Sequence, residues 1–570
     1  MPTPSPAPVS PHAPPPPDHS ADPLPRRETA AERRARPSFH EIAVAAAQTH
    51  GVCVRPLVMG TVNLDTGATD YAAVPCKSTM ESQCAPCAKK ARALRMQQCR
   101  EGWHLDHEPV QPAIEPTEQQ SELLRSRADL VAAYRDATTD RDHDHEAVAE
   151  LRAAVGELDT QLRATGMRGT LPPLDPPPTP LRTRSTKRRH DVIDLPTRQV
   201  RKNTIGQQYV GKYRPSMFLT LTCDSYGPIQ GGAPIDPGAY DYRRAARDAI
   251  HFAALLDRFI QNLRRVLGWD VQYFATVEPQ KRGAPHVHMA LRGAIPHALV
   301  RQVAAATYHQ VWWPNHDQLI YTDSGRLPVW NPTRCTFIDP DTHTPLTSWQ
   351  DALQAVDDDP DANPAHVVRF GEQVHSKGIL GGGTEAGRHI GYLTKYLTKS
   401  IGEIITPTTA AQHAHHERLH TELAITPCSP RCPIWLRYGI VPKGASSKMV
   451  AGQCKSKAHR RSTLGLPGRR VLVSRKWSGK TLPDHQADRH KFVRQLLADA
   501  GITPDARDNV LIYRLESGQR TPPRSELIMR AISQRLTWKA QYTNAIAAIG
   551  PPEGQRIGAG ASPGPGSRGR

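Results

Sequence analysis

Hydrophobic and polar residues alternate, or recur at helical spacing, over much of residues 213–400, and these patterns predict a folded core. The stretch SMFLTLTC alternates as a half-buried strand does, which places Thr220 and Thr222 on one face. The stretch YDYRRAARDAIHFAALLDRFIQNLRRVLG predicts a long amphipathic helix that ends at Gly268. A strand followed by a covering helix begins the core.

Two more strands and two more helices are predicted after this helix. VQYFATVEP and APHVHMALRG have the pattern of strands, joined by the turn QKRG. PHALVRQVAAATYHQVW and TEAGRHIGYLTKYLTKS have the spacing of helices, and the acidic, proline-punctuated residues 315–375 between them are typical of an insertion. This order predicts an α+β fold, a compact antiparallel sheet covered by helices, of ferredoxin-like type.

The charge of the chain indicates its class of partner. Its 570 residues include 73 Lys plus Arg and 55 Asp plus Glu, for a net charge of +18. Basic clusters such as RTRSTKRRH and CKSKAHRRSTLGLPGRR favour nucleic acid over a mere excess of basic tails. No apolar run approaches a membrane span, and the N-terminus lacks the apolar segment of a signal peptide. We therefore expect a soluble, cytoplasmic protein whose ten cysteines are metal ligands or thiols rather than disulfides.

Two histidines one residue apart, His286 and His288, project from the same face of the strand APHVHMALRG. Such a pair is weak evidence of a metal site by itself. Glu278, however, lies at the end of the preceding strand, where a hairpin would fold it back beside the pair. Two imidazoles and one carboxylate suit Mn²⁺ or Mg²⁺ and leave open positions for a phosphate oxygen.

Two tyrosines with lysines one turn away, Tyr392 with Lys395 and Tyr396 with Lys399, supply a nucleophile. A phenol near a metal-polarised phosphodiester can attack phosphorus and become covalently attached to the strand. The lysines can lower the phenol pKa or hold the non-bridging oxygens. Taken alone, this motif is better interpreted as an ordinary amphipathic helix with solvated lysines. The histidine pair and Glu278 in the same chain favour the nucleophile instead.

The motifs resemble those of a known enzyme superfamily. PHVHMALRG is similar to the histidine, hydrophobe, histidine motif of HUH endonucleases, FLTLTC resembles their first motif, and LTKYLTK fits their tyrosine motif. Long stretches, among them GWDVQYFATVEPQKRGAPHVH, TYHQVWWP and GRRVLVSRKWSGKTL, are similar to replication initiators of actinobacterial plasmids and integrative conjugative elements. The resemblance covers roughly residues 50–110 and 170–490.

The resemblance implies rolling-circle initiation, in which one strand is nicked at an origin, a 5′-phosphotyrosine link forms, a free 3′-hydroxyl primes synthesis, and the strand is later rejoined. It also implies that His286 and His288 bind the divalent metal, with Glu278 as third ligand. Conjugative relaxases and HUH transposases share this active site and remain alternatives. A zinc-dependent DNA-binding regulator with an inactive nuclease core is an alternative from another class.

By position in the tyrosine motif, Tyr396 is the preferred nucleophile, because Leu393 lies three residues before it and Lys399 three after. Tyr392 ranks second, since His389 stands where a hydrophobe belongs. The two tyrosines could act in relay, or one could act alone with termination by water, and the sequence does not choose.

Three cysteines, Cys76, Cys84 and Cys87, have the spacing C-x7-C-x2-C, and the CAPC knuckle is typical of a zinc site. The fourth ligand is either Cys53 or Cys99. Cys99 is nearer in sequence but lies in a stretch with helical pattern, where cysteines are often simply buried.

A second group, Cys428, Cys432, Cys454 and His459, has the spacing C-x3-C-x21-C-x4-H of a Cys₃His site, against the alternative of four unrelated residues. Both groups have basic flanks and lie outside the strands with the histidine pair. Structural zinc that shapes DNA-binding surfaces is the role we predict for them.

These predictions divide the chain into eight parts and leave its oligomeric state open. No nucleotide-binding phosphate loop was found, so a host helicase, together with a polymerase, is expected as a partner beside origin DNA. The parts are 1–37, a disordered proline-rich basic arm; 38–116, an N-terminal zinc-binding module; 117–166, a helical hairpin; 167–205, a proline-rich basic linker; 206–402, the endonuclease domain; 403–480, a second zinc-binding basic module; 481–545, a helical C-terminal region; and 546–570, a disordered tail.

Overall fold

The computed structural model divides the chain into two compact units. Residues 1–88 and 492–570 form the terminal unit, and residues 89–491 form the central unit. The division falls inside two helices, α3 (Glu81–Trp103) and α12 (Leu482–Asp499). The structure describes residues 29, 32, 36–103, 105, 107–109, 116–139, 144–167, 171–175, 191–205, 215–380, 384–395, 397–399, 401–466, 470–501, 509–516, 518–519 and 521–549.

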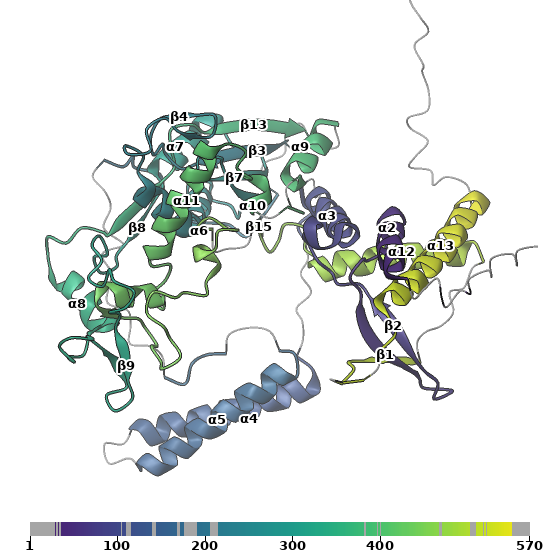
Figure 1. Ribbon diagram of the computed structural model, residues 1–570, viewed down its shortest axis with the longest axis horizontal. Coiled ribbons are helices and arrows are strands. Elements are labelled where there is room, and N and C mark those ends of the chain that lie inside the picture. The colour runs from purple at the N-terminus through teal and green to yellow at the C-terminus, as the bar shows by residue number, and fades with distance from the viewer. Residues whose placement is uncertain are drawn as a thin grey trace, which may run out of the picture. The chain divides into compact units, whose positions relative to one another are not determined.

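The central unit contains a five-stranded antiparallel sheet, ordered β13-β3-β7-β6-β15 (Figure 1). Its strands are β3 (Pro215–Thr222), β6 (Tyr273–Pro279), β7 (Pro285–Arg292), β13 (His375–Leu380) and β15 (Val471–Val473). Strands β3, β6 and β7 are those predicted from the alternating stretches of the sequence. Because side chains alternate along each strand, the sheet has two faces of different character.

One face of the sheet is apolar and packs against α6 (Tyr242–Leu267), α7 (His297–Ala306) and α11 (Ala410–Ile425) in the largest hydrophobic core. Helix α6 begins where the carboxylate of Asp241 accepts the backbone N–H of Arg244, a side-chain N-cap. It ends at Gly268, which has a φ of 76° and so adopts the left-handed conformation that glycine tolerates best. Both ends agree with the predicted amphipathic helix.

The opposite face carries aromatic and polar side chains and packs against α9 (Thr384–Thr394). Phe218, Phe274 and Ala290 from the sheet contact Ile390 and Leu393 of α9, and the last turn of α3 joins the same cluster. The predicted helix from residue 384 is therefore present but shorter than expected, because α9 ends at Thr394.

The expected insertion, residues 315–375, packs against the region of the second cysteine group. Trp349 and Trp435 lie with ring centroids 5.1 Å apart, and β11 pairs in parallel with β14. The two segments therefore form one subdomain, where the sequence suggested an insertion and a separate module. The short elements of the central unit, including those of this subdomain, are β4 (Ile229–Gln230), β5 (Ala233–Pro234), β8 (Tyr308–Val311), β9 (Val329–Asn331), β10 (Thr336–Ile338), β11 (Thr347–Ser348), α8 (Trp349–Asp358), β12 (His366–Arg369), α10 (Ile401–Ile404), η2 (Pro433–Tyr438), β14 (Ile440–Val441) and η3 (Lys457–His459).

One predicted helix is too long. Helix α7 stops at Ala306, and the chain turns directly into strand β8, which pairs with β12. Thr307, Tyr308 and Val311 are β-branched or aromatic residues that favour an extended backbone, and the pairing with β12 outweighs the helical spacing of the preceding residues.

The terminal unit joins the two ends of the chain. Its three-stranded sheet has the order β16-β1-β2, and α2 packs against α13 (Figure 1). Ile528 and Ile532 of α13 are buried against Ala43 and Ala47 of α2. The C-terminal helical region therefore completes the N-terminal module. The elements are α2 (Pro37–Thr49), β1 (Leu57–Asn63), β2 (Thr69–Val74), the start of α3, β16 (Val510–Tyr513) and α13 (Arg524–Ile549).

Residues 117–166 fold as the expected helical hairpin, α4 (Glu118–Thr139) and α5 (His145–Ala164), which lie side by side in Figure 1. An ion pair of 2.5 Å joins the buried Arg127 to Asp159 across the hairpin. The arm and tail predicted to be disordered lie almost entirely outside the described residues. In the part of the chain that is described, no helix is both long and apolar enough to cross a bilayer.

Candidate functional site

The hairpin of β6 and β7 brings Glu278, His286 and His288 together. Glu278 lies directly opposite His286 in the strand register, and His288 follows two residues later on the same face. The turn is closed by a hydrogen bond from the Gln280 N–H to the Ala284 carbonyl. One carboxylate oxygen and one nitrogen from each ring all lie within 4.8 Å of one another, a geometry that fits a metal ion.

The electrostatics of these three side chains favour a cation. Burial lowers the pKa of His286 to about 4 and that of His288 to about 3, so both rings are neutral at pH 7. Burial raises the pKa of Glu278 to about 7, against the opposing charges of Arg470 and Lys395. The two Nε2 atoms approach to 2.9 Å, and His286 Nδ1 is buried without a hydrogen-bond partner. The donor set, two neutral nitrogens and a carboxylate that a cation would keep ionised, fits Mn²⁺ or Mg²⁺.

Two side chains of β3 hold His288 in place. Thr220 Oγ1 lies 2.8 Å from His288 Nδ1, which leaves Nε2 to point toward Glu278 and His286. The ring of Phe218 stacks on the same imidazole at a centroid distance of 5.9 Å. The alternating pattern placed Thr220 on one face of its strand but indicated no role for it. Its register with His288 was a usable signal once the hairpin was paired with β3.

Helix α9 places Tyr392 at the histidines. The phenolic oxygen lies 3.2 Å from His288 Nε2, and the two rings meet edge to face with centroids 4.8 Å apart. The helix is fixed to the sheet because Thr276 Oγ1 donates a 2.8 Å hydrogen bond to the Leu393 carbonyl. Tyr392 as a whole is 45% exposed.

The remaining residues of the tyrosine motif are placed less fully. Tyr396 lies outside the described residues. Lys395 follows the end of α9 with an exposed side chain, and its charge acts to lower the pKa of Glu278. Lys399 is also exposed, and its carbonyl accepts a hydrogen bond from Arg470 Nη1.

Arg470 is a site residue that the sequence analysis missed. Its Nη2 lies 3.8 Å from Glu278 Oε1, while Nε and Nη2 are buried without hydrogen-bond partners. Its backbone carbonyl accepts the N–H of Val277, which fixes the residue at the start of β15 beside β6. The run PGRR is one of several basic clusters, and nothing in its spacing indicated a position next to Glu278.

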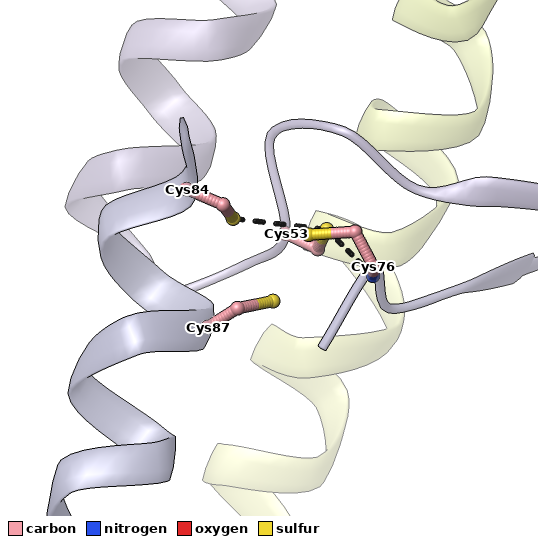
Figure 2. Close-up of side chains that lie close together, drawn as sticks. All are labelled: Cys53, Cys76, Cys84 and Cys87. Atoms are coloured by element: carbon pink, nitrogen blue, oxygen red, sulfur yellow. Dashed lines mark hydrogen bonds between the residues drawn. The ribbon is translucent and has the colours of Figure 1, made fainter. Parts of the chain in front are cut away.

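The first cysteine group consists of Cys53, Cys76, Cys84 and Cys87, with all four sulfurs within 4.8 Å of one another (Figure 2). The sulfurs of Cys53 and Cys84 are 3.8 Å apart, and the Cys76 N–H donates to Cys53 Sγ at 3.3 Å. Burial opposes ionisation of Cys84, but the N–H groups of Cys87 and Val54 bring its pKa below the usual value. Four cysteine sulfurs in one group are one of the ligand sets that bind structural zinc.

Cys99, the other sequence candidate for the fourth ligand, is not part of this group. It is fully buried in the central unit, where it packs in the cluster of Trp103 and Trp477. Burial raises the pKa of its thiol, as it does for other buried cysteines, and its sulfur is not among the four that come together.

The second cysteine group also comes together. One ligand atom from each of Cys428, Cys432, Cys454 and His459 lies within 4.8 Å of the others. His459 Nδ1 donates to the Leu423 carbonyl at 2.8 Å, so Nε2 faces Cys432 Sγ at 3.5 Å. Hydrogen bonds from Cys432 and Cys454 lower the pKa of Cys428. Both groups could hold a structural metal such as zinc, and the carbonyl behind His459 is the support that zinc-bound imidazoles usually have.

Known proteins similar to this chain share a role in replication. The family model described as RepSA, replication initiator protein, pSAM2, matches residues 39–534. A replication initiator protein of Streptomyces ambofaciens is 31% identical over 111 residues, which cover 14% of this chain and 24% of that protein. The alignment thus spans about a quarter of this relative. No solved structure matches the chain.

Proposed function

Because the chain belongs to the RepSA family of replication initiator proteins, we propose that it starts replication by nicking one DNA strand with a tyrosine, as in rolling-circle replication. The observation that carries this proposal is the position of the Tyr392 hydroxyl, 3.2 Å from His288 Nε2 and beside Glu278 and His286. Metal-assisted cleavage of a phosphodiester by an enzyme tyrosine needs the phenol next to a metal site, and nitrogen and oxygen ligands would supply such a site here.

In the proposed reaction the phenolic oxygen of Tyr392 forms a bond to phosphorus while the bond from phosphorus to the 3′-oxygen breaks. The phenol loses its proton and the departing 3′-oxygen gains one, so the products are a 5′-phosphotyrosine link and a free 3′-hydroxyl. A divalent ion held by Glu278, His286 and His288 would supply positive charge to the non-bridging oxygens. The reverse reaction, attack of a 3′-hydroxyl on the link, rejoins the strand.

The chain's own residues support this reaction in distinct ways. Thr220 and Phe218 orient His288, and the bond from Thr276 to the Leu393 carbonyl fixes the helix that carries the tyrosine. Arg470 and Lys395 place positive charge beside Glu278, where a phosphate would approach. The antiparallel sheet covered by helices on the face away from the histidines is consistent with a ferredoxin-like HUH core.

Tyr396 fits the sequence motif better than Tyr392 does, so it remains a candidate nucleophile, in second place. Tyr392 is assigned the first attack because its hydroxyl lies 3.2 Å from His288 Nε2. Both tyrosines together would allow a relay, with one cutting and the other terminating.

The test uses a single-stranded oligonucleotide with the origin of the replicon that encodes this chain, together with Mn²⁺ or Mg²⁺, on a denaturing gel. We expect a metal-dependent covalent adduct with the wild type and with Tyr396→Phe, and none with Tyr392→Phe or His286→Ala. Loss with Tyr396→Phe alone would move the nucleophile to that residue. A wild type that binds the origin but forms no adduct with any metal would leave the non-catalytic regulator as the better function.

A further inference from the structure

Residues 426–470 carry an unbalanced positive charge. This segment includes the second cysteine group and contains ten Lys and Arg residues but no Asp or Glu. Two of the ten side chains have a carboxylate partner among the described contacts, Arg461 with Glu417 and Arg470 with Glu278. The segment therefore keeps a large excess of positive charge, which favours a polyanion as partner.

Five exposed cations of this segment lie around the cysteine group, and together they form the basic surface. Four of them are one or two residues away from a ligand in the sequence. The fifth, Lys443, is brought in by a 2.8 Å hydrogen bond from its N–H to the carbonyl of Pro430, two residues before Cys432. The side chain of Arg460 reaches back, so that its Nη2 donates to the Lys455 carbonyl at 3.4 Å. The five are Arg431, Lys443, Lys455, Lys457 and Arg460.

Carboxylates do not neutralise the basic surface. None of its five cations forms an ion pair with another residue in the part of the chain that the structure describes. The acidic helix that packs beside β14 is α8, and its carboxylates bond locally. Asp351 accepts the Ser348 hydroxyl at 2.6 Å, and Asp358 accepts Gln354 Nε2 at 2.7 Å. The five ammonium and guanidinium groups are therefore open to an external anion.

The basic surface is fixed to the core that supports the histidine site. Ala458, Leu464 and Leu466, which come directly after it in sequence or between its residues, are buried in the largest hydrophobic core. A few residues further on, the same segment brings Arg470 to Glu278. A molecule bound at the basic surface would therefore have a defined position relative to the histidines.

The aromatic residues of the segment separate duplex from single-stranded DNA as the partner. Trp435 and Tyr438 are its only Trp, Tyr or Phe residues, and they are 0% and 7% exposed. Proteins that bind single strands usually stack the bases on exposed aromatic rings. Proteins that hold a duplex contact its phosphates with Lys and Arg, which requires no ring. The basic surface therefore suits the backbone of a duplex.

We propose that the basic surface binds the phosphate backbone of duplex DNA and holds the origin duplex in place for the nicking site. This contact rests on the proposed function, since it would present the origin to the tyrosine and the histidines. A duplex carries one negative charge per about 1.7 Å of its axis, so neighbouring phosphates can meet several of the five cations at once. Contacts of this kind supply affinity without reading the base sequence.

Binding is measured without cutting, so that the result does not depend on nicking. A fluorescent duplex of arbitrary sequence is titrated with the full chain at several salt concentrations, in the absence of Mg²⁺ and Mn²⁺. The triple glutamine variant, Arg431→Gln with Lys443→Gln and Lys455→Gln, removes one cation from each of the three stretches that form the basic surface. All three side chains are exposed, so the fold should tolerate the changes, and thermal unfolding checks this.

The matched control combines Arg258→Gln, Arg301→Gln and Arg334→Gln. These changes remove the same charge from α6, α7 and the turn between β9 and β10. All three side chains are exposed and form no ion pair among the described contacts. The control therefore separates the position of the lost charge from its amount.

We expect the triple glutamine variant to bind the duplex about tenfold more weakly or worse, and the control to remain within about twofold of the wild type. The slope of log affinity against log salt should become shallower by about 0.9 for each lost phosphate contact. Exchanging Lys443 and Lys455 for Arg should preserve the affinity, since both side chains bind phosphate. Equal weakening in the control, or none in the glutamine variant, would overturn the assignment.

Two other ligands test the choice of partner. The affinity for a fluorescent oligothymidine should fall by at most about twofold in the triple glutamine variant, because the surface offers no ring for stacking. A loss as large as that for the duplex would make the surface a single-strand contact instead. Polyglutamate should displace the duplex only at a much higher concentration of charge than unlabelled duplex does. Equal displacement would point to an acidic protein partner and would overturn the assignment to DNA.

Nicking assays separate the basic surface from the proposed function. The triple glutamine variant should cut a single-stranded origin oligonucleotide as the wild type does, but cut a supercoiled origin plasmid about tenfold more slowly at limiting protein. Equal rates on the plasmid would overturn the role in holding the origin. A wild type that cuts neither DNA, with duplex binding that still depends on the basic surface, would retain the duplex contact while the proposed nicking function fails.

Discussion

The hydrogen bond between Thr220 and His288 sets the orientation of the His288 ring. Removing the threonine hydroxyl with Thr220→Val keeps the side-chain shape but deletes the 2.8 Å bond to His288 Nδ1. Supporting residues of this kind typically contribute 10-fold to 100-fold in metal affinity. We therefore expect Mn²⁺ to bind about tenfold more weakly, as measured by calorimetry on the full chain.

Thr222→Val is the matched control for this change. Thr222 lies two residues further on the same face, opposite His286, and its hydroxyl makes no bond to a histidine among the described contacts. Mn²⁺ affinity should remain within about twofold of the wild type. An equal loss in both variants would mean that the strand, and not the hydroxyl of Thr220, determines the affinity.

The raised pKa of Glu278, about 7, makes the site sensitive to pH when no divalent ion is added. A carboxyl whose folded pKa lies above its unfolded value favours folding when protonated, and this contribution is lost as pH rises through the folded pKa. Between pH 5.5 and 8, the wild type should lose roughly 2 kcal/mol of unfolding free energy relative to Glu278→Gln. The difference should level off above about pH 7.

Urea unfolding followed by tryptophan fluorescence measures this difference. Saturating Mn²⁺ should remove the pH dependence from the wild type, because the ion would keep Glu278 ionised, and it should leave Glu278→Gln unchanged. Parallel stability curves for the two proteins over the whole range would contradict a buried, proton-binding Glu278.

At the level of elements, the turn between β6 and β7 sets the register of the site. Gly283 in this turn has a φ of 81°, and a Cβ there would lie 2.6 Å from Leu419 Cδ2. Gly283→Ala should therefore destabilise the protein by roughly 1–3 kcal/mol, from backbone strain and the clash with α11. Thermal unfolding measures the loss.

Gly387→Ala provides the comparison for this change. Gly387 lies inside α9, and a Cβ at that position meets no atom within 4 Å. Alanine should leave stability unchanged or raise it by up to about 1 kcal/mol, as it does in helix interiors. A Gly283→Ala protein as stable as Gly387→Ala would show that the turn adapts freely.

The elements also show how far sequence patterns lead. The strands around His286 and Glu278 followed from alternation, because burial on one face forces a period of two. The end of α9 at Thr394 did not follow, since the helical spacing of the tyrosine motif continues beyond it. Arg470 could not be placed either, because its position depends on β15 joining the sheet edge beside β6, a pairing between segments nearly two hundred residues apart.

At the scale of the whole molecule, the sequence analysis treated the chain ends as separate regions, although they fold together. The spacing of Cys76, Cys84 and Cys87 indicated a metal site, but it left the fourth ligand open between Cys53 and Cys99. Cys53 joins the group because β1, β2 and the start of α3 bring distant segments together. The spacing of cysteines along the chain carries no information on which distant segments come together in the fold.

The packing of the C-terminal segments against the N-terminal ones makes the first cysteine group depend on the C-terminal region. Ile528 and Ile532 of α13 are buried in the same cluster as Cys53, Cys84 and Cys87, and β16 pairs with β1. A chain that ends at residue 491 loses this support, so the module should lose its metal and become sensitive to protease. We expect elemental analysis to find about two zinc ions per full chain and about one per shortened chain, since a site this closed depends on folding.

Three variants of the full chain separate the two sites in the same measurement. Cys53→Ser should match the shortened chain, at about one zinc ion, whereas Cys99→Ala should keep both. Cys432→Ser should lose the other ion, because its sulfur belongs to the group with His459. A shortened chain that retains two zinc ions would contradict the dependence on α13, and loss of an ion in Cys99→Ala would return that cysteine to the first site.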